Sequence, residues 1–405
     1  MNLSADERAA LGRVDPEAML ARVTAWAKVA SGSRDLEGLE RMAALLTEAA
    51  SPLGEVHRAP PALATRVEPD GEVTAERLGD SLLLSARPDA PTRVILTGHY
   101  DTVFGPGHPF RDVRWLRPGV LNGPGVADMK GGIVVLLEAL RLFEASPFAP
   151  NLGWEVVLNA DEEVGSPGSA PLLARCAARV QAGLVFEPSL PDGTLVGARP
   201  GSGNFALIVR GRSAHAGRNP EEGRNAVLAA ADLALRLSTL AGPDLKVNVA
   251  AIEGGGVLNM VPGTAVLRVN LRPASTAAED RASAGLDEAM AQVARRHDVT
   301  IARHGGFARP PKPLDARQRP LFALVARTAA DLGLEIGWRP TGGVCDGNNL
   351  AACGLPVVDT LGVRGGAIHS PDEFLIVESL AERARLAALV LMRLAQHGVP
   401  AEGAS

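Results

Sequence analysis

Residues 94–103, VILTGHYDTV, and residues 125–132, GVADMKGG, determine the architecture of this chain of 405 residues. The run at 94–97 is apolar, which is typical of a buried strand. His99 and Asp101 follow two residues apart, so in an extended chain both side chains lie on one face. That arrangement suits a metal-binding imidazole whose second ring nitrogen is held by a carboxylate. Taken alone, the pair also fits a buried, hydrogen-bonded histidine.

Strands and helices alternate on both sides of this stretch. Strands are predicted at 81–85, 94–97, 154–160 and 183–186, the first two as neighbours, with helices in 15–51, 133–143 and 170–178 and irregular structure at 60–80. The alternation predicts an α/β domain with a mostly parallel sheet. Glu162, Glu163 and Glu187 directly follow predicted strands. Ligand sites in such sheets lie at the carboxyl ends of strands, so we expect these residues to meet there.

The pattern changes near residue 199 and returns to α/β after the PPKP run at 310–313. Strands at 204–210, 264–272 and 299–303, a further strand before 264, and helices at 225–240 and 277–297 give a β-α-β-β-α-β order. That order resembles a ferredoxin-like domain. We therefore predict a catalytic domain in two parts, 1–202 and 312–405, with an inserted dimerisation domain at 203–311.

The composition excludes several functions. The net charge is −5 and no dense Lys/Arg run occurs, which argues against nucleic acid or an anionic membrane as a partner. The amino terminus lacks the apolar core of a signal peptide, and no apolar run reaches the ~20 residues of a membrane span. Three cysteines are too few for a disulfide framework. A disulfide between Cys345 and Cys353 is an alternative, but a reduced, cytoplasmic protein is the simpler expectation.

Five residues together form a candidate metal site, and they are His99, Asp128, Glu163, Glu187 and His369. Two imidazoles and three carboxylates are a mixed N/O donor set that suits zinc, and also cobalt or manganese. Five ligands can serve two ions if one carboxylate bridges them, and such pairs, ~3.5–4 Å apart, activate a shared water. Glu162 lies beside a ligand without a metal to hold, so it is free to act as a base.

Seven segments give the chain a specific resemblance. In order they are TGHYDTV (97–103), GVADMKGG (125–132), NADEEVGSPGS (159–169), FEPS (186–189), RSAHAGRNPEEG (212–223), TGGVCDGNN (341–349) and GAIHSPDE (366–373). They resemble the co-catalytic zinc metallopeptidase superfamily that contains carboxypeptidase G, aminoacylase, acetylornithine deacetylase and succinyl-diaminopimelate desuccinylase. The likeness is greatest to the glutamate carboxypeptidase branch and spans nearly the whole chain. Singly, each segment has an ordinary structural explanation.

The resemblance implies roles at the metal site. His99 and Glu187 hold one zinc ion, Glu163 and His369 hold the other, and Asp128 bridges them. Asp101 then orients His99, and Glu162 is the general base.

The resemblance also implies roles for the inserted domain. There His215 is expected to reach the active site of a partner subunit in a homodimer. Asn259 and Arg272 match positions linked to substrate binding, although a purely structural role is an alternative for both. Arg309 is a further candidate for binding a substrate carboxylate. The thiol of Cys345 departs from the small polar residue usual at that place in the family.

These features predict a dizinc hydrolase that cleaves an amide bond next to a free carboxylate, releasing a C-terminal glutamate or a similar amino acid. Its substrates are then N-acyl amino acids or short peptides. An N-acyl amino acid deacylase or an aminopeptidase of the same superfamily is the alternative enzyme. A non-catalytic binding module that retains the fold is the alternative from another class.

Overall fold

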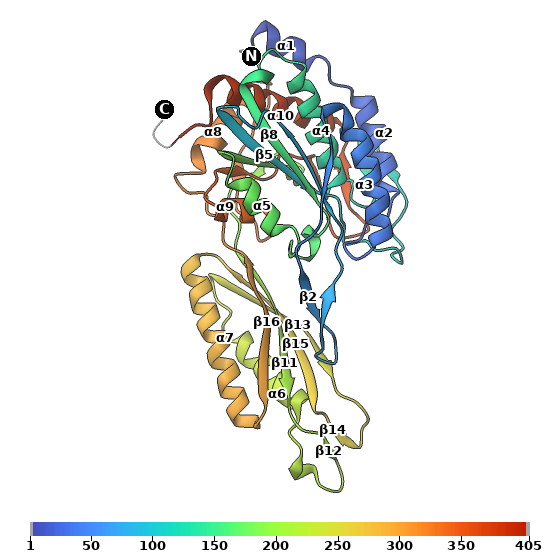
Figure 1. Cartoon of the computed structure of the whole chain (residues 1–405), viewed down its shortest axis with the longest axis vertical. Coiled ribbons are helices and arrows are strands. Elements are labelled where there is room, and N and C mark those ends of the chain that lie inside the picture. Colours follow the sequence, from blue (N-terminus) through green and yellow to red (C-terminus); the bar gives the residue numbers. More distant parts are fainter. Residues whose placement is uncertain (1–2, 402–405) are drawn as a thin grey trace.

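The computed structural model describes residues 3–401 and consists of two units stacked along the long axis of the molecule (Figure 1). The upper unit combines about the first half and the last quarter of the chain, and the lower unit is built from the segment between them. The chain therefore crosses between the units twice. The predicted α/β fold with an inserted α+β unit is confirmed.

A six-stranded sheet forms the centre of the upper unit. Its order is β1-β4-β8-β5-β9-β18; β8, β5, β9 and β18 are parallel, and β4 pairs antiparallel with both β8 and β1. The bounds are β1 (His57–Ala59), β4 (Ser81–Ala86), β5 (Thr92–His99), β8 (Leu152–Asn159), β9 (Ala182–Val185) and β18 (Val357–Val358). The prediction that the strands at 81–85 and 94–97 are neighbours was wrong. Every residue of β8 is buried, so β8 takes a central position between β4 and β5.

Helices cover both faces of this sheet. The helices on one face pack in the large apolar core, and they are α1 (Ala5–Leu11), α2 (Pro16–Ala27), α3 (Leu36–Ala50), α4 (Lys130–Glu144), α8 (Arg319–Asp331) and α10 (Glu378–His397). Two others, α5 (Ala170–Ala177) and α9 (Asp346–Ala352), pack on the opposite face in a second apolar cluster. Helix α4 begins very close to the end of β9. A Cβ on Gly132 would lie 2.0 Å from the carbonyl oxygen of Phe186, so only glycine allows this approach.

The lower unit contains a four-stranded antiparallel sheet of order β13-β15-β11-β16. The strands are β11 (Ser202–Arg210), β13 (Leu245–Gly254), β15 (Thr264–Pro273) and β16 (Thr300–Arg309), and the helices α6 (Ala226–Ser238) and α7 (Thr276–His297) pack on one face. This is the β-α-β-β-α-β arrangement expected from the sequence. Strand β13 is an edge strand of the sheet.

The other face of the lower sheet is partly covered by a hairpin from the upper unit, made of β2 (Ala64–Val67) and β3 (Val73–Glu76) (Figure 1). Val67 packs against Ile208 and Val266, and Arg268 donates to the Val67 carbonyl at 2.8 Å. The prediction of irregular structure at 60–80 was therefore wrong. Both strands are four residues long and mix apolar with polar residues, and Val73 is itself exposed, so the pairing left a weak signal in the sequence.

Short strands shape the loops around the sheet ends. They form the sheet β19-β20-β7-β6 and the pairs β10–β17 and β12–β14, with bounds β6 (Arg114–Arg117), β7 (Val120–Asn122), β10 (Leu195–Val196), β12 (Ala214–His215), β14 (Met260–Val261), β17 (Trp338–Arg339), β19 (Gly365–Gly366) and β20 (Phe374–Ile376). The cysteines are free thiols, so Cys345 and Cys353 are not joined. Within residues 3–401, none of the helices combines the length and apolarity needed to span a bilayer.

Candidate active site

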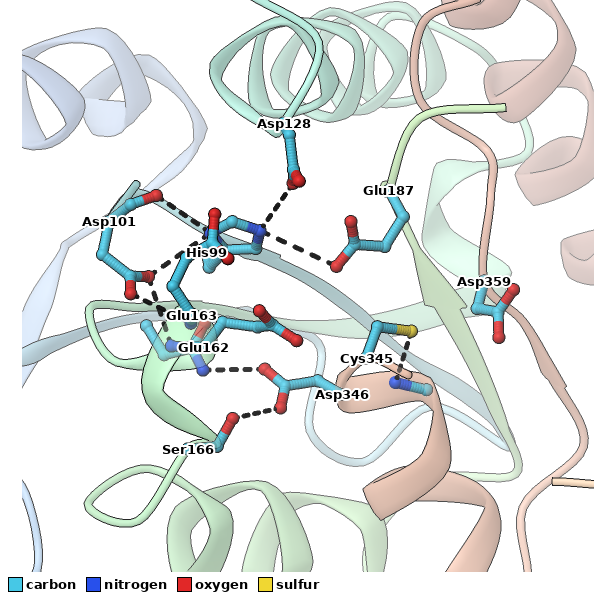
Figure 2. A network of polar contacts seen from close by, with 12 residues as sticks. His99, Asp101, Asp128, Glu162, Glu163, Ser166, Glu187, Cys345, Asp346 and Asp359 are labelled. Carbon is cyan, nitrogen blue, oxygen red and sulfur yellow. Dashed lines mark hydrogen bonds and ion pairs between the residues drawn. The ribbon is translucent and has the colours of Figure 1, made fainter. Parts of the chain in front are cut away.

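The candidate ligands meet at the carboxyl ends of three parallel strands. His99 ends β5 and pairs in register with Asn159 at the end of β8, and β9 ends two residues before Glu187. The acidic residues after β8 lie in a short 3₁₀ turn, Glu162–Val164. Asp128 comes from the loop before α4, and His369 from the loop after β19. Figure 2 shows Asp101, Asp128 and Glu187 in contact with His99.

His99 is buried among three carboxylates. Its Nε2 lies 3.1 Å from Oδ1 of Asp128 and 3.7 Å from Oε1 of Glu187. Its Nδ1 lies 3.0 Å from the carbonyl oxygen of Asp101 and 3.3 Å from Oδ1 of the same residue. Asp101 therefore holds the imidazole so that Nε2 faces Asp128 and Glu187.

Asp128 lies between the two histidines. Its Oδ1 faces His99, whereas its Oδ2 lies 3.2 Å from Nε2 of His369. The same nitrogen of His369 is 3.1 Å from Oε2 of Glu163. A carboxylate with one oxygen directed toward each imidazole has the geometry of a bridging ligand.

Asp101 also fixes the acidic turn. Its two carboxylate oxygens accept hydrogen bonds from the backbone N–H groups of Glu162, at 3.2 Å, and Glu163, at 3.1 Å. The hydroxyl of Ser33 donates to Asp101 at 2.7 Å. One buried carboxylate thus sets the position of both the imidazole and the turn (Figure 2). Ser33 was not identified from the sequence, because it lies outside the segments that carried the resemblance.

Glu162 is buried beside Arg309. Oε1 of Glu162 lies 2.7 Å from Nη2 of Arg309, which also donates to the Glu162 carbonyl at 3.0 Å and to the hydroxyl of Ser166 at 2.8 Å. Behind Arg309, the carboxylate of Asp346 accepts hydrogen bonds from Ser166 and Asn159. Burial raises the pKa of Glu162 to about 8, against the attraction of Arg309. The guanidinium of Arg309 is therefore committed to the acidic turn in this structure.

The electrostatics of the cluster favour cations. Burial raises the pKa of Glu163 and raises that of Glu187 well above its ordinary value. Hydrogen bonds to Asp128 and Glu163 raise the pKa of His369 to about 11. Carboxylates crowded in a buried site repel one another, so positive charge among them is stabilised.

The donor atoms also suit a divalent metal. One donor atom from each of His99, Asp128 and Glu163 lies within 4.8 Å of the others, and the same holds for His99, Glu162 and Glu187. Mixed imidazole and carboxylate donors suit zinc and related divalent ions. The residues present therefore fit the predicted type of cofactor.

A cavity of about 470 Å³ opens in front of the cluster. Its lining includes Asp128, the acidic turn, Glu187 and His369, together with Arg199, Arg272, Arg309 and the loop 341–344. The cavity thus combines the anionic cluster with three arginine side chains.

Arg199 belongs to a buried charge network that was not found from the sequence. Its Nε donates to Oδ2 of Asp359 at 2.7 Å, and Nζ of Lys312 lies 3.2 Å from the same oxygen. Two cations thus share one carboxylate, which leaves a surplus positive charge at the wall of the cavity. The three residues come from distant segments and have no local pattern that links them.

The remaining predicted residues lie in two places. Arg272 lines the cavity and donates to the Gly342 carbonyl at 2.8 Å. His215 and Asn259 lie instead around β12 and β14, at the tip of the lower unit and away from the upper unit (Figure 1). They neighbour each other, since Ala216 donates to the Asn259 carbonyl at 2.9 Å, and both are exposed. Within one chain, these two residues are not brought to the cavity.

The fold and this site define a metallohydrolase of the peptidase and deacylase type. Residues 95–393 match the family model described as peptidase family M20/M25/M40. The chain belongs to that family.

Relatives and solved structures agree with this assignment. Carboxypeptidase G2 of Pseudomonas sp. (strain RS-16) is 30% identical over 78% of this chain and 77% of its own length. Succinyl-diaminopimelate desuccinylase of Verminephrobacter eiseniae (strain EF01-2) is 28% identical over 73% of this chain and 77% of its own length. An M20 family metallo-carboxypeptidase of Sulfolobus solfataricus has the same fold, with a TM-score of 0.71 at 16% identity, covering 92% of this chain and 98% of its own.

Proposed function

We propose that the protein is a dizinc hydrolase that cleaves an amide bond next to a free carboxylate and releases glutamate or a similar amino acid. The observation that carries this proposal is the cavity, whose lining combines the anionic cluster with the side chains of Arg199, Arg272 and Arg309. The similarity to carboxypeptidase G2 supports the same substrate class. We further propose that residues 1–202 and 312–405 form the catalytic domain and that residues 203–311 form the dimerisation domain.

The proposed metal ligands follow the contacts of the two histidines. His99 and Glu187 would hold one ion, His369 and Glu163 the other, and Asp128 both. Zinc is our first choice, although cobalt and manganese suit the same donors. When bound, two such ions would lower the pKa of a water molecule and polarise the scissile carbonyl.

Glu162 is the proposed general base. It would accept the proton of the attacking water and pass that proton to the leaving nitrogen. Burial raises its pKa, which strengthens its affinity for the proton that it would take from the water. Asp101 would keep the turn that carries Glu162 in place through its two backbone hydrogen bonds.

Arg199 is our leading candidate for the substrate carboxylate, in addition to Arg272 and Arg309. Asp359 holds Arg199 through Nε and Nη2, while Nη1 lies toward Gly343 at the cavity wall. Because Lys312 competes for the same carboxylate, Arg199 is incompletely neutralised. A charged guanidinium held in advance loses little entropy when it binds an anion. Arg309 would contribute after rearrangement of its contacts with the acidic turn.

We also propose a homodimer in which His215 and Asn259 complete the active site of the partner subunit. These residues lie far from the cavity of their own chain (Figure 1). Strand β13 offers an unpaired sheet edge, and exposed apolar side chains lie near it, on α6 (Leu228 and Leu235) and on β13 itself (Ile252). We propose that the dimer forms through this surface with two-fold symmetry, which is the commonest symmetry among oligomers. His215 would then stabilise the oxyanion of the tetrahedral intermediate.

A deacylase or an aminopeptidase of the same family is the second candidate, favoured by the similarity to succinyl-diaminopimelate desuccinylase. A non-catalytic binding module is less well supported, because it has no use for the buried base Glu162. A carboxypeptidase and an N-acyl amino acid deacylase both require a free carboxylate next to the scissile bond, an aminopeptidase requires a free amine, and a binding module turns over none of these substrates.

A substrate panel tests the proposed specificity. We expect the zinc-loaded protein to hydrolyse N-acyl-L-glutamate with a kcat/KM ~10–100-fold above that for N-acyl-L-alanine, since a hydrogen bond to a charged group contributes ~1.5–3 kcal/mol. Arg199→Met should raise KM for both substrates, because both carry the carboxylate next to the scissile bond, whereas Arg175→Met, at an exposed arginine of α5, should leave KM unchanged. Equal rates on both substrates would contradict the glutamate assignment. Turnover of free dipeptides but not of acylated ones would identify an aminopeptidase.

A further inference from the structure

Glu373 is a buried carboxylate that touches the site only through backbone groups. It is 0% exposed and lies four residues after His369, directly before β20. Its Oε1 accepts hydrogen bonds from the N–H groups of Ala127, at 2.9 Å, and Asp128, at 3.0 Å. Its Oε2 accepts a third bond from Gly125, at 3.1 Å. One side chain thus binds three N–H groups of the loop that delivers Asp128.

The same two loops are joined at their base. Strand β7 pairs with β20, with Asn122 opposite Phe374. The side-chain amide of Asn122 donates to the Pro371 carbonyl at 3.0 Å and to the Glu373 carbonyl at 2.6 Å. The loop 123–128 is therefore attached to the segment 369–373 at its start by Asn122 and at its end by Glu373.

The segment 369–373 consequently holds Asp128 in two ways. Nε2 of His369 faces the Asp128 carboxylate at 3.2 Å. The Glu373 carboxylate accepts a hydrogen bond from the backbone N–H of Asp128. The position of Asp128 relative to both histidines depends on the backbone of residues 125–128. A carboxylate has only acceptor atoms, so it satisfies three converging N–H groups that an amide would satisfy only in part.

We propose that Glu373 is a positioning residue that sets the geometry of Asp128 and thereby the metal affinity of both ion sites. This inference rests on the proposed function, in which Asp128 bridges two ions. Glu373 itself contacts neither the substrate nor an ion. Groups that orient metal ligands typically affect metal affinity or activity by ~10–100-fold. Because the bridge is shared, loss of Glu373 weakens both sites together.

The test is a metal-binding measurement on Glu373→Gln. Metal-free protein is titrated with zinc and with cobalt in competition with a chromophoric chelator, and the visible spectrum of the dicobalt form is recorded. We expect both ions to bind ~10–100-fold more weakly than in the parent, with an altered cobalt spectrum, because the variant presents an N–H₂ group to the loop. The matched control is Asp372→Asn, which removes the neighbouring carboxylate on an exposed side chain and should change neither readout.

The outcomes separate this inference from the proposed function. Asp128→Ala serves as the reference and should impair both ions. If Asp128→Ala does so while Glu373→Gln binds within threefold of the parent with the same cobalt spectrum, the positioning role is overturned. If Asp128→Ala itself binds two ions normally, the proposed metal site is wrong. Glu373→Asp, which keeps the charge but shortens the reach, replaces Glu373→Gln if the latter fails to fold by far-UV circular dichroism.

Discussion

Glu162→Gln should abolish turnover while leaving the metal content unchanged. Gln keeps the size of the side chain and its place in the turn held by Asp101, and the proposed ligands are untouched. An amide cannot accept the proton of the attacking water, and general base catalysis contributes ~10²–10⁴-fold. The loss should appear in kcat at nearly constant KM, because Glu162 acts on the water rather than on the bound substrate.

Steady-state kinetics and metal analysis on the same preparation check this result. Glu335→Gln is a suitable control, since it makes the same change on an exposed side chain and should leave kcat unaltered. A Glu162→Gln variant that retains kcat within tenfold would show that another group removes the proton. A variant that loses its metal would show instead that Glu162 is a ligand.

His215→Ala should lower kcat by ~10²–10³-fold, the usual cost of removing one oxyanion donor. The variant should remain a dimer and bind both ions, because His215 is exposed and far from the cluster of its own chain. The nearby Arg218→Ala provides a control on the same exposed turn. Unaltered turnover of His215→Ala would exclude the proposed contact with the substrate.

Subunit mixing locates the action of His215. Glu162→Gln and His215→Ala dimers are allowed to exchange subunits. If His215 acts across the interface, each mixed dimer has one site with both defects and one site with neither. Random pairing in a two-fold dimer then restores about a quarter of the parent activity. If His215 acts within its own chain, every site retains one defect. Absence of recovery, with exchange confirmed by a mass-tagged subunit, would contradict the trans arrangement.

Much of the candidate site could be predicted because its residues lie at strand ends. His99, Glu163 and Glu187 follow apolar runs, and parallel strands bring their carboxyl ends to one edge of a sheet. Asp128 and His369 come from loops without a regular period, so their side chains identified them only as candidate donors, and their roles came from the resemblance to a known family. In the structure Nε2 of His369 lies 3.2 Å from Oδ2 of Asp128.

The rest depends on contacts between distant segments. The position of β8 between β4 and β5 follows from pairing that no local pattern records. Arg199 forms one network with Lys312 and Asp359, although both of these residues lie more than a hundred positions further along the chain. Buried charges of this kind resemble surface charges in sequence, because a single residue carries no sign of its partner. Glu373 was overlooked for the same reason, since its three partners are backbone N–H groups.

Zinc titration of the metal-free protein, with hydrolysis of N-acyl-L-glutamate followed in parallel, tests the central claim most directly. We expect no turnover before zinc is added and a rise that ends at two ions per chain, because Asp128 links two sites that act on one substrate. Cobalt should restore activity after chelation as well. Full turnover in protein shown by elemental analysis to be free of metal would contradict the account.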